Sequence, residues 1–360
     1  MEKTHDILGM GTMIYGYFCH ASDKTIRDLG LVPGQHTAVQ YPLGDFERML
    51  AKMDDVVCNY PLSSITNVLI ANALCGGKPK YIGFAPPSTE ANEFRALLEK
   101  AGVETQLVIS DAVPLRKGIA AIAPNKEAAY LIFAENKQTP REIVKLEDAI
   151  AHAEYLLVHT THLFEPEDSP GFRPYQIAKE HQTKIIADLG WSSPPSEDID
   201  LERRLALCDI LLGTELEFDR YTIAIQQRRE LDLLGKHYLK YAPLVIIKKG
   251  ANGVDIGWRM SMSRPYPGGF GVNSLRLPAF PVENVLHLSG AGDAFAGAFL
   301  AEMKEHGLFD TGSINFVRDT LLECAVVGCL AASHLIAHTK PFLDETFLEQ
   351  LLEVRAARNI

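Results

Sequence analysis

The stretch His287–Phe295, HLSGAGDAF, combines residue types that could do chemistry together. Its two glycines stand directly before an apolar run, which predicts a helix start. The first amides of a helix lack intrahelical acceptors, so Gly290, Ala291 and Gly292 could direct N–H groups at an anion such as a phosphate. Asp293 would repel an anion, but it could take the proton from a hydroxyl that attacks phosphorus. A purely structural glycine-rich helix start has the same pattern, and these residues alone leave both interpretations open.

The composition is that of a globular chain, and it excludes several classes of protein. Of 360 residues, 47% are hydrophobic and 22% are charged, which allows a large buried core. The formal net charge of −11 argues against nucleic acid as a partner. The six cysteines are scattered and form no CxxC pair, so neither disulfides nor a zinc site is predicted.

Membrane and secretory signals are missing from the sequence. No apolar run reaches the roughly 18 residues that a membrane helix needs. The first residues, MEKTHDILGMG, enter a strand-like run without the order of regions that marks a signal peptide. We therefore expect a cytoplasmic protein with no membrane partner.

Strand-like and helix-like segments alternate along most of the chain, which predicts an α/β protein with a mainly parallel sheet. The predicted strands are 6–14, 79–85, 105–110, 153–160, 183–190, 209–214 and 242–250. The predicted helices are 63–75, 88–102, 174–182, 201–208 and one opening at 214–222.

Two regions break this alternation. Residues 36–42 form a short strand-like segment, and residues 105–135 hold successive strand candidates without helices between them. These candidates predict β-hairpins that form a small antiparallel sheet beside the main domain. A further hairpin is predicted between residue 250 and the glycine motif, around the Pro/Gly-rich SRPYPGGFG.

Several segments, in order, resemble the ribokinase-like (PfkB) family of carbohydrate and nucleoside kinases. PVENVLHLSGAGDAFAGAFLAEM (281–303) resembles its C-terminal signature, and VIIKKGANGV (245–254) its strand and turn beside the ATP phosphates. CDILLGTELEFDRYT resembles the segment with its Asn-x-x-Glu motif, and 63–85 with 94–105 its early substrate-side segment. GMGTMI with SDKTIRDLGLVPG is most similar to adenosine-kinase-type members. The likeness covers most of residues 7–340.

The resemblance implies a ribokinase-like three-layer α/β/α fold with a small β-sheet lid. The nucleotide-binding core would comprise residues 1–15, 45–104 and 136–360, and the lid residues 16–44 and 105–135. It also implies that Asp293 is the catalytic base and that Gly290-Ala291-Gly292 form the anion hole for the transferring phosphoryl group.

The implied cofactors are ATP and Mg²⁺, and a monovalent cation is left open. Gly250 and Gly253, with Lys248 or Lys249, match the residues that line the ATP phosphates and ribose, although a lysine pair also commonly ends a surface strand. Glu217 matches the glutamate that organises Mg²⁺ largely through water.

Other matches have structural explanations of equal standing. Ala325 and Gly328 lie where the family closes the adenine pocket, but plain core packing explains them as well. Asn67 matches an asparagine that contacts substrate hydroxyls, while an Asn at a helix start is often only a cap.

Departures from the family pattern are concentrated on the acceptor side. Gly16 stands where the family has an Asp that binds sugar hydroxyls, and Leu62-Ser63 replace its Gly-Gly. Thr214 replaces the Asn of Asn-x-x-Glu. Trp191-Ser192 stand where many members carry Asn and Arg.

The sequence also contains weaker motifs. His159 to His162 (HTTH) could bind a metal, but no third ligand is evident, and a loop or a wall of the acceptor pocket fits better. No G-x-x-x-x-G-K-[ST] occurs, which excludes a P-loop enzyme, and Ile14 breaks a dinucleotide fingerprint.

The sequence thus predicts an ATP-dependent kinase that phosphorylates a hydroxyl, most simply a CH₂OH, of a sugar, nucleoside or similar small molecule. The lid would exclude water from the reaction, and its strand edges would favour pairing into a homodimer. The alternative is a catalytically silent, nucleotide-binding regulatory relative of the same fold, which the acceptor-side departures favour.

Overall fold

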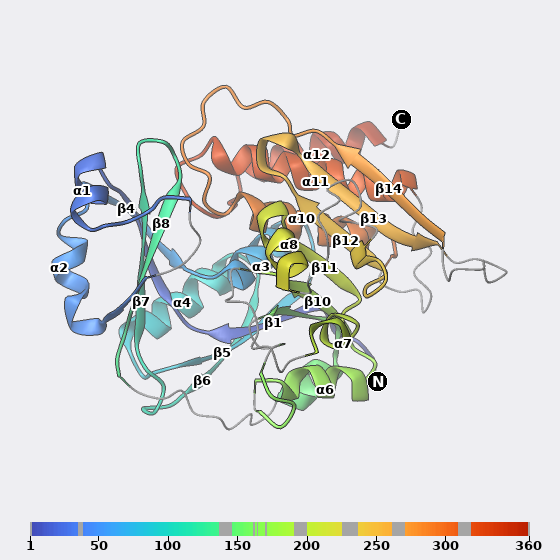
Figure 1. The fold of residues 1–360 in the computed structure, drawn as a ribbon, viewed down its shortest axis with the longest axis horizontal. Coiled ribbons are helices and arrows are strands. Elements are labelled where there is room, and N and C mark those ends of the chain that lie inside the picture. The colour runs from blue at the N-terminus through green and yellow to red at the C-terminus, as the bar shows by residue number, and fades with distance from the viewer. Residues whose placement is uncertain are drawn as a thin grey trace. The chain divides into compact units, whose positions relative to one another are not determined.

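The computed structural model describes residues 2–34, 39–136, 146–160, 163, 165–169, 171–190, 200–224, 237–260, 271–308 and 318–358. Its strands form two sheets (Figure 1). In spatial order, the nine-stranded sheet holds β14 (Gly271–Leu277), β13 (Val254–Met260), β12 (Leu244–Lys248), β11 (Ile210–Thr214), β10 (Lys184–Asp188), β9 (Ala153–His159), β1 (His5–Thr12), β5 (Pro79–Ala85) and β6 (Glu104–Ile109).

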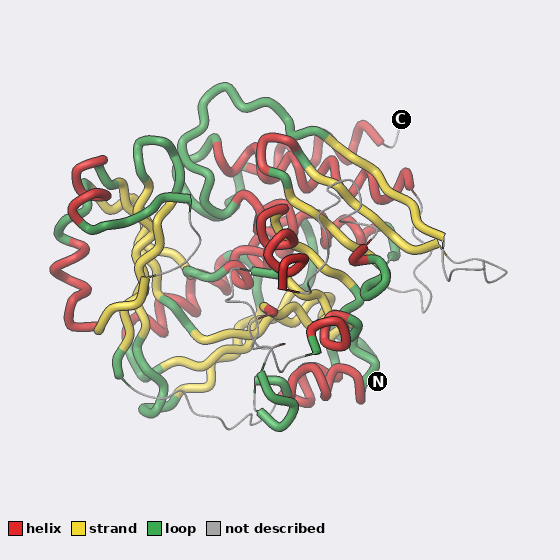
Figure 2. Tube along the Cα trace, viewed as in Figure 1, coloured by secondary structure: helices red, strands yellow, loops and turns green. Residues whose placement is uncertain are grey.

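The pairing in the large sheet is mostly parallel. Strands β1, β9, β10, β11 and β12 pair in parallel, as do β5 and β6, whereas β12, β13 and β14 form an antiparallel end. Parallel strands need crossover connections, and the alternation of strands and helices supplies them (Figure 2). The predicted α/β class with a mainly parallel sheet is confirmed.

A smaller, five-stranded sheet holds, in order, β3 (Val39–Pro42), β8 (Ala128–Ala134), β7 (Arg116–Ile122), β2 (Tyr15–His20) and β4 (Asp55–Pro61). It is mixed: β3 and β8, and β2 and β7, pair in parallel, while β7–β8 and β2–β4 are antiparallel.

The helices are α1 (Asp23–Asp28), α2 (Phe46–Leu50), α3 (Ser64–Leu74), α4 (Thr89–Lys100), α5 (Leu146–Ala151), α6 (Arg173–Glu180), α7 (Leu201–Leu205), α8 (Glu215–Ala224), α10 (Ala291–Glu305), α11 (Arg318–Ile336) and α12 (Phe347–Arg358). Local caps explain several of their starts. Ser88 accepts the N–H of Ala91 at 3.2 Å and caps α4.

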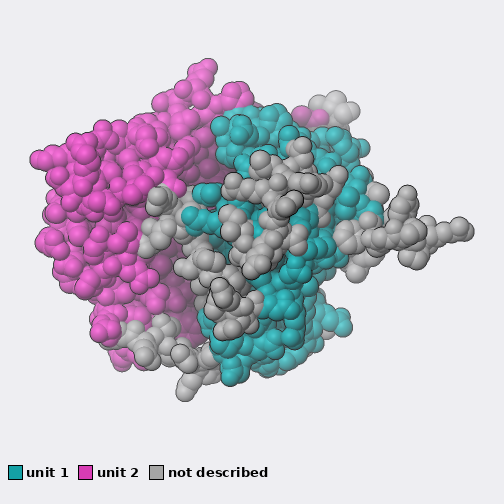
Figure 3. Space-filling view, in the orientation of Figure 1, with its two compact units in different colours: residues 1–9, 141–280, 298–329 teal, residues 10–140, 281–297, 330–360 magenta. Residues whose placement is uncertain are grey.

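The chain divides into two compact units, coloured separately in Figure 3. Unit 1 comprises Met1–Gly9, Arg141–Phe280 and Ala298–Cys329. Unit 2 comprises Met10–Pro140, Pro281–Gly297 and Leu330–Ile360. The small sheet and the glycine motif therefore belong to unit 2.

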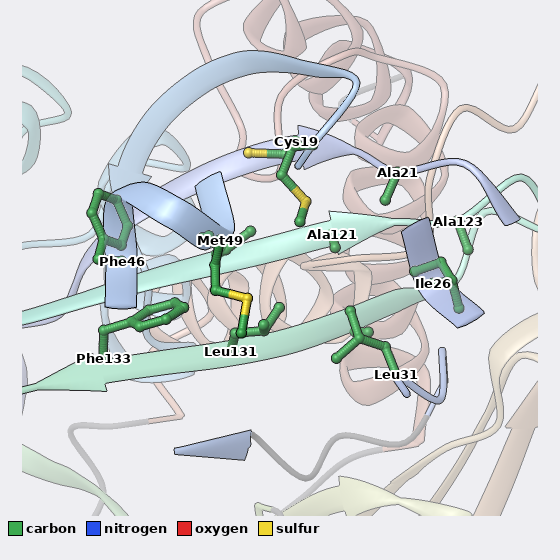
Figure 4. Packing of buried hydrophobic residues seen from close by; sticks show 13 residues of the cluster. Cys19, Ala21, Ile26, Leu31, Phe46, Met49, Ala121, Ala123, Leu131 and Phe133 are labelled. Carbon is green, nitrogen blue, oxygen red and sulfur yellow. The ribbon is translucent and has the colours of Figure 1, made fainter. Parts of the chain in front are cut away.

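One face of the small sheet carries a hydrophobic core of its own inside unit 2 (Figure 4). Phe46 and Met49 of α2 and Ile26 of α1 pack against strand residues that alternate toward them, including Leu131 and Phe133. Burial of these side chains on one sheet face explains why the short helices α1 and α2 form, since isolated helices of that length are unstable in water.

The membership of the small sheet differs from the sequence prediction at two strands. Residues 105–109, predicted for the small sheet, lie in β6, which pairs in parallel with β5 in the large sheet. Conversely β4, from a segment assigned to the core, pairs with β2 in the small sheet. A strand–helix–strand connection through α4 favours the parallel pairing of β5 and β6. The division into core and lid at the proposed residue boundaries stays a prediction.

Helix α11 passes a test of length and hydropathy for a membrane span, although no such run was predicted. Half of the relevant window is buried inside the structure. A buried helix in the core of a soluble protein gives the same signal, so this single helix is weak support for a membrane segment.

Candidate active site

The glycine motif forms the N-terminus of α10 in unit 2, as predicted. Gly290 precedes the helix with φ +81°, a conformation that favours glycine. A Cβ on Gly290 would also lie 2.3 Å from the carbonyl oxygen of Pro341. Asp293 and Ala294 both donate their N–H to Gly290 O, which leaves the amides of Ala291 and Gly292 in the turn that has no intrahelical acceptor.

Asp293 lies in the first turn of α10, half-buried, with hydrogen bonds to both carboxylate oxygens. The hydroxyl of Ser64 donates to Oδ1 at 2.6 Å. The Nδ2 of Asn67 donates to Oδ2 at 3.3 Å. Ser64 lies 229 residues and Asn67 lies 226 residues before Asp293 in the sequence, so two distant segments meet at this carboxylate.

Ser64 and Asn67 both come from the first turn of α3, which explains their common target. Ser63 is the N-cap residue of α3, and Asn67 donates its N–H to Ser63 O at 3.1 Å. Asn67 is 8% exposed, and its Oδ1 is buried without a hydrogen-bond partner. Asn67 is therefore more than the simple cap that was the alternative, because its side chain binds the carboxylate of Asp293.

The segment before α10 is held in place by other parts of unit 2. The hydroxyls of Ser289 and Tyr130 lie 2.9 Å apart, and Leu288 donates its N–H to Lys126 O in the β7–β8 turn. His287 contacts Lys340 O through Nε2 at 3.1 Å. Burial, together with the nearby carboxylate of Asp293, raises the pKa of Tyr130 to about 12, so this hydroxyl stays protonated at neutral pH.

In unit 1, Gly250 and Gly253 shape the turn between β12 and β13. Their φ values are +55° and +87°. A Cβ at Gly253 would lie 2.0 Å from the carbonyl oxygen of Leu277 in β14. The close approach of β14 is therefore enough to require glycine at position 253. Nothing lies within 4 Å of a Cβ built on Gly250, and that glycine borders open space.

Lys248 and Lys249 lie beside this turn, and Lys249 forms ion pairs. Lys249 binds Asp255 at 3.1 Å and Glu215 at 3.4 Å, and these acidic neighbours raise the pKa of Lys249. Asp255 is also bound by Arg276. Lys248 ends β12 directly before Lys249, and its contact with a nucleotide phosphate stays a prediction.

Glu217, at 7% exposed, forms a reciprocal capping arrangement with Thr214 at the start of α8. Its Oε2 accepts the N–H of Thr214 at 2.6 Å, and Thr214 Oγ1 accepts the N–H of Glu217 at 3.3 Å. This is a capping box in which Thr214 is the N-cap residue of α8, a role that Asn also fills in helices. Among the described residues, no group of three or more His, Cys, Asp or Glu could hold a metal ion.

The remaining predicted positions fall in several places. Ala325 and Gly328 are buried in the part of α11 that belongs to unit 1. His159 is the last residue of β9. A Cβ built on Gly190 would lie 2.4 Å from Nδ1 of His159, so the two residues are close neighbours. His162, Trp191 and Ser192 lie outside the described residues, as does most of SRPYPGGFG.

The Gly16 position is closed to any side chain. A Cβ there would lie 2.6 Å from the Cβ of Leu62 and 2.9 Å from Tyr60 O. The carboxylate that the resemblance places at this position therefore cannot be accommodated beside Leu62.

Comparison with known proteins decides the family. Residues 65–341 match the pfkB family carbohydrate kinase domain, which is well over half of the chain. The chain belongs to the pfkB family of carbohydrate kinases. This pfkB-family chain is 27% identical over 314 residues to the 5-dehydro-2-deoxygluconokinase of Geobacillus kaustophilus, covering 83% of this chain and 88% of that one. It is 22% identical over 331 residues to a nucleoside kinase of Methanothermobacter thermautotrophicus, covering 88% and 90%.

Solved structures establish the ribokinase-like fold of this pfkB-family kinase. A probable sugar kinase from Rhizobium etli matches with a TM-score of 0.75 and 18% identity, over 99% of this chain and 100% of that chain. The adenosine kinase of Sinorhizobium meliloti matches with a TM-score of 0.74 and 17% identity, over 99% of both chains. The ribokinase of Thermotoga maritima matches with a TM-score of 0.66 and 16% identity, over 97% and 99%.

The geometry adds residues of this pfkB-family kinase that the sequence did not single out. Ser64 was not predicted as a site residue, yet its hydroxyl donates to Asp293 at 2.6 Å. Tyr130 and Ser289 were missed as well. The only signal for Ser64 was its place in the first turn of the helix that carries Asn67.

Proposed function

We propose that this kinase transfers the γ-phosphate of ATP to a hydroxyl, most simply a CH₂OH, of a sugar, nucleoside or similar small molecule, with Asp293 as general base. One observation carries the proposal. A carboxylate held at both oxygens by Ser64 and Asn67 stands in the first helical turn, beside the amides of Ala291 and Gly292.

In the proposed reaction, Asp293 takes the proton of the acceptor hydroxyl as that oxygen attacks the γ-phosphorus. The bond between the γ-phosphorus and the β,γ-bridging oxygen breaks, and ADP leaves with that electron pair. The amides of Gly290, Ala291 and Gly292 stabilise negative charge on the transferring group. Ser64 and Asn67 hold the two carboxylate oxygens in place, and the carboxylate takes up the proton of the acceptor hydroxyl.

The donor-side residues are proposed from their match to the family and from the chemistry of unit 1. Lys248, Gly250 and Gly253 would bind the ATP phosphates and ribose, and the open space beside Gly250 fits a close approach by a phosphate. Ala325 and Gly328 would line the adenine pocket, where their small size allows close packing.

Mg²⁺ fits this chain only as an ion carried largely by ATP and water. Mg²⁺ keeps much of its hydration and needs few protein carboxylates. Glu217 offers a buried carboxylate with one oxygen already bound to a backbone N–H. It would therefore act on the ion through water, and when bound the ion neutralises phosphate charge. Whether a monovalent cation is also needed is tested by measuring ADP release after one monovalent salt is exchanged for another.

The acceptor is proposed at the level of class. The relatives named above act on 5-dehydro-2-deoxygluconate, nucleosides or adenosine by their names, and each of these carries a hydroxyl. We also propose a small-molecule acceptor as partner, no nucleic acid or membrane partner, and a cytoplasmic location. The edge strands β3 and β4 of the small sheet support a homodimer, which sedimentation would test.

The competing proposal is a catalytically silent relative that binds nucleotide. It is favoured by one observation, the absence of room for a carboxylate at Gly16. One assay distinguishes the two proposals: ADP release from Mg-ATP is measured with a panel of sugars, nucleosides and other small alcohols. As an enzyme, the chain should release ADP in the presence of an acceptor, and Asp293→Asn should lower that rate by about 100-fold or more.

The control for this assay is binding. Both wild type and Asp293→Asn should gain thermal stability with ATP, because a ligand that binds only the folded state stabilises it. ATP-dependent stabilisation without acceptor-dependent ADP release would overturn the kinase proposal and leave the silent relative.

A further inference from the structure

Two glycines lie side by side in the small sheet of unit 2. Gly16 of β2 pairs with Gly118 of β7 on one side and with Tyr60 of β4 on the other. Adjacent glycines leave a patch of sheet face without side chains. We call this patch the Gly16–Gly118 trough.

Leu62 fills the trough. A Cβ at Gly16 would lie 2.6 Å from Leu62 Cβ, and a Cβ at Gly118 would lie 2.1 Å from Leu62 Cδ2. The backbone of Leu62 is fixed as well, since its N–H donates to Ile14 O at 3.0 Å. Leu62 is 9% exposed. Its position is therefore set by packing and by the backbone together.

The sheet face around Leu62 is mostly apolar. The buried residues of this cluster are Phe18, Tyr60, Leu62, Ala120, Ile122 and Ala128. Ile14 and Ile132 pack against them and are partly exposed. Tyr130 also packs against this cluster, and its hydroxyl is engaged with Ser289 at 2.9 Å. The side chain of Leu62 itself offers a hydroxyl no hydrogen-bond partner.

This mostly apolar surface adjoins the proposed base. Leu62 stands two residues before Ser64, whose hydroxyl binds Asp293. Tyr60, in the same cluster, lies near enough to Asp293 that, after burial, the carboxylate is among the causes that raise the pKa of Tyr60. A molecule that places a hydroxyl at Asp293 must therefore bring its neighbouring atoms close to this surface.

One polar atom beside the base remains to be matched. Asn67 Oδ1 is buried without a partner, while its Nδ2 is bound to Asp293. An amide oxygen accepts hydrogen bonds only. It suits a second hydroxyl of the acceptor, on the side of the base that α3 provides.

We propose that Leu62, seated in the Gly16–Gly118 trough, selects a deoxygenated acceptor, meaning a sugar, sugar acid or nucleoside with a CH₂ or CH₃ at the carbon that faces Leu62. This inference rests on the proposed kinase function and adds its specificity. One hydroxyl of the acceptor meets Asp293, a second meets Asn67 Oδ1, and the carbon facing Leu62 carries none.

The size of the discrimination follows from general energetics. A hydrophobic contact surface rejects an analogue that adds a hydroxyl by about 10- to 100-fold, because the added hydroxyl is buried without a partner. Wild type should therefore use the deoxy member of a matched acceptor pair with a kcat/KM about 10- to 100-fold above that of its hydroxylated partner.

The test measures ADP release with matched pairs: deoxyribose and ribose, deoxyadenosine and adenosine, and 5-dehydro-2-deoxygluconate and its hydroxylated parent. Only release that Asp293→Asn abolishes is counted. The best acceptor should be a deoxy compound that exceeds its partner by the factor above. A best acceptor that is hydroxylated, or a pair used equally, overturns the inference and leaves the kinase proposal standing.

Variants at Leu62 identify the residue that discriminates. Leu62→Asn keeps the size of the side chain and adds hydrogen-bonding groups, so the deoxy preference should fall by about 10-fold. Leu62→Met keeps an apolar side chain of similar volume and should retain the preference. Equal preferences in the two variants would overturn the role of Leu62. The comparison of acceptor pairs with the wild type needs no variant, so the proposal is tested even if a variant fails to fold.

A last outcome concerns the proposed function itself. If ATP stabilises the fold but no acceptor supports ADP release that depends on Asp293, the kinase proposal fails and this inference fails with it. That result differs from Asp293-dependent release confined to hydroxylated acceptors, which refutes the inference alone.

Discussion

Replacement of Ser64 by alanine tests whether the hydrogen bond to Asp293 matters for catalysis. The Ser64 hydroxyl donates to Oδ1 at 2.6 Å, whereas Asn67 reaches Oδ2 at 3.3 Å. Ser63→Ala is the matched control, because Ser63 is the adjacent N-cap of the same helix and its side chain makes no capping hydrogen bond. The two variants remove the same hydroxyl one residue apart.

The expected magnitude follows from the charge on the acceptor of this bond. A hydrogen bond to a charged group contributes about 1.5–3 kcal/mol. Asp293 is half-buried, so solvent screening favours the low end of that range. Loss of a donor to the ionised carboxylate favours its protonated form. The acidic midpoint of the kcat/KM profile should therefore move to higher pH.

Positioning is lost as well as charge stabilisation. With Oδ1 no longer held by Ser64, the carboxylate can rotate away from the acceptor hydroxyl, and kcat should fall by about 10- to 100-fold. Ser64→Thr keeps the hydroxyl and should restore both kcat and the midpoint.

The assay is steady-state ADP release measured across the acidic half of the pH range for wild type and the three variants. Thermal unfolding of each variant checks that the fold is intact. The reasoning is refuted if Ser64→Ala leaves the acidic midpoint in place, or if Ser63→Ala moves it by the same amount.

Two further predictions concern stability in unit 2. Gly290→Ala forces alanine into a left-handed backbone conformation and places its Cβ 2.3 Å from a carbonyl oxygen. We expect the free energy of unfolding, measured with denaturant, to fall by about 2–5 kcal/mol. Gly30→Ala, at φ +62° with open space around the new Cβ, should lose only about 1–2 kcal/mol, and equal losses would contradict the clash. Burial alone would raise the pKa of Asp344, but hydrogen bonds from Thr346 and Lys340 lower it to about 2. This carboxylate therefore stabilises the fold above its ordinary pKa of 3.8, and the stabilisation is lost as pH falls toward 2. Urea unfolding of wild type and Asp344→Asn should show a gap that is constant near neutral pH and closes in that acidic window, and a gap that persists there would contradict the linkage.

The sequence predicted much of the fold because local signals agreed with it. Helix α3 and helix α4 were found with their starts, since polar caps precede apolar periodic segments there. The start of α10 was found from the glycines and the apolar run that follows. In each case a short stretch of chain contains the whole signal.

Sheet membership was harder, because pairing joins segments that local signals do not connect. The strand at 104–109 and the strands at 116–134 look alike in sequence, and only the partner distinguishes them. The connection through α4 carried the missing information, since a strand–helix–strand unit predicts parallel pairing. Such a succession is not sufficient by itself, because α3 connects β4 to β5 and yet β4 pairs with β2 in the small sheet.

The candidate site shows the same limit at the level of single residues. Asp293 and Asn67 were predicted from family motifs, and the structure joins them by a hydrogen bond. Ser64 needed the structure, because its partner lies 229 residues away. The absence of an acid at Gly16 was visible in the sequence, but only the structure supplies the reason, which is the side chain of Leu62.

The first turn of α3 and the residue before it link catalysis to selection. Ser64 and Asn67 hold the proposed base, and Leu62, at the end of the preceding strand, fills the trough beside it. An acid at Gly16 would collide with Leu62, so a change of acceptor toward one that needs this acid must first alter residue 62. Such a change leaves the hydrogen bonds to Asp293 intact, because they come from the helix and not from the sheet. Specificity can therefore shift through Gly16 and Leu62 while the phosphoryl-transfer chemistry is kept.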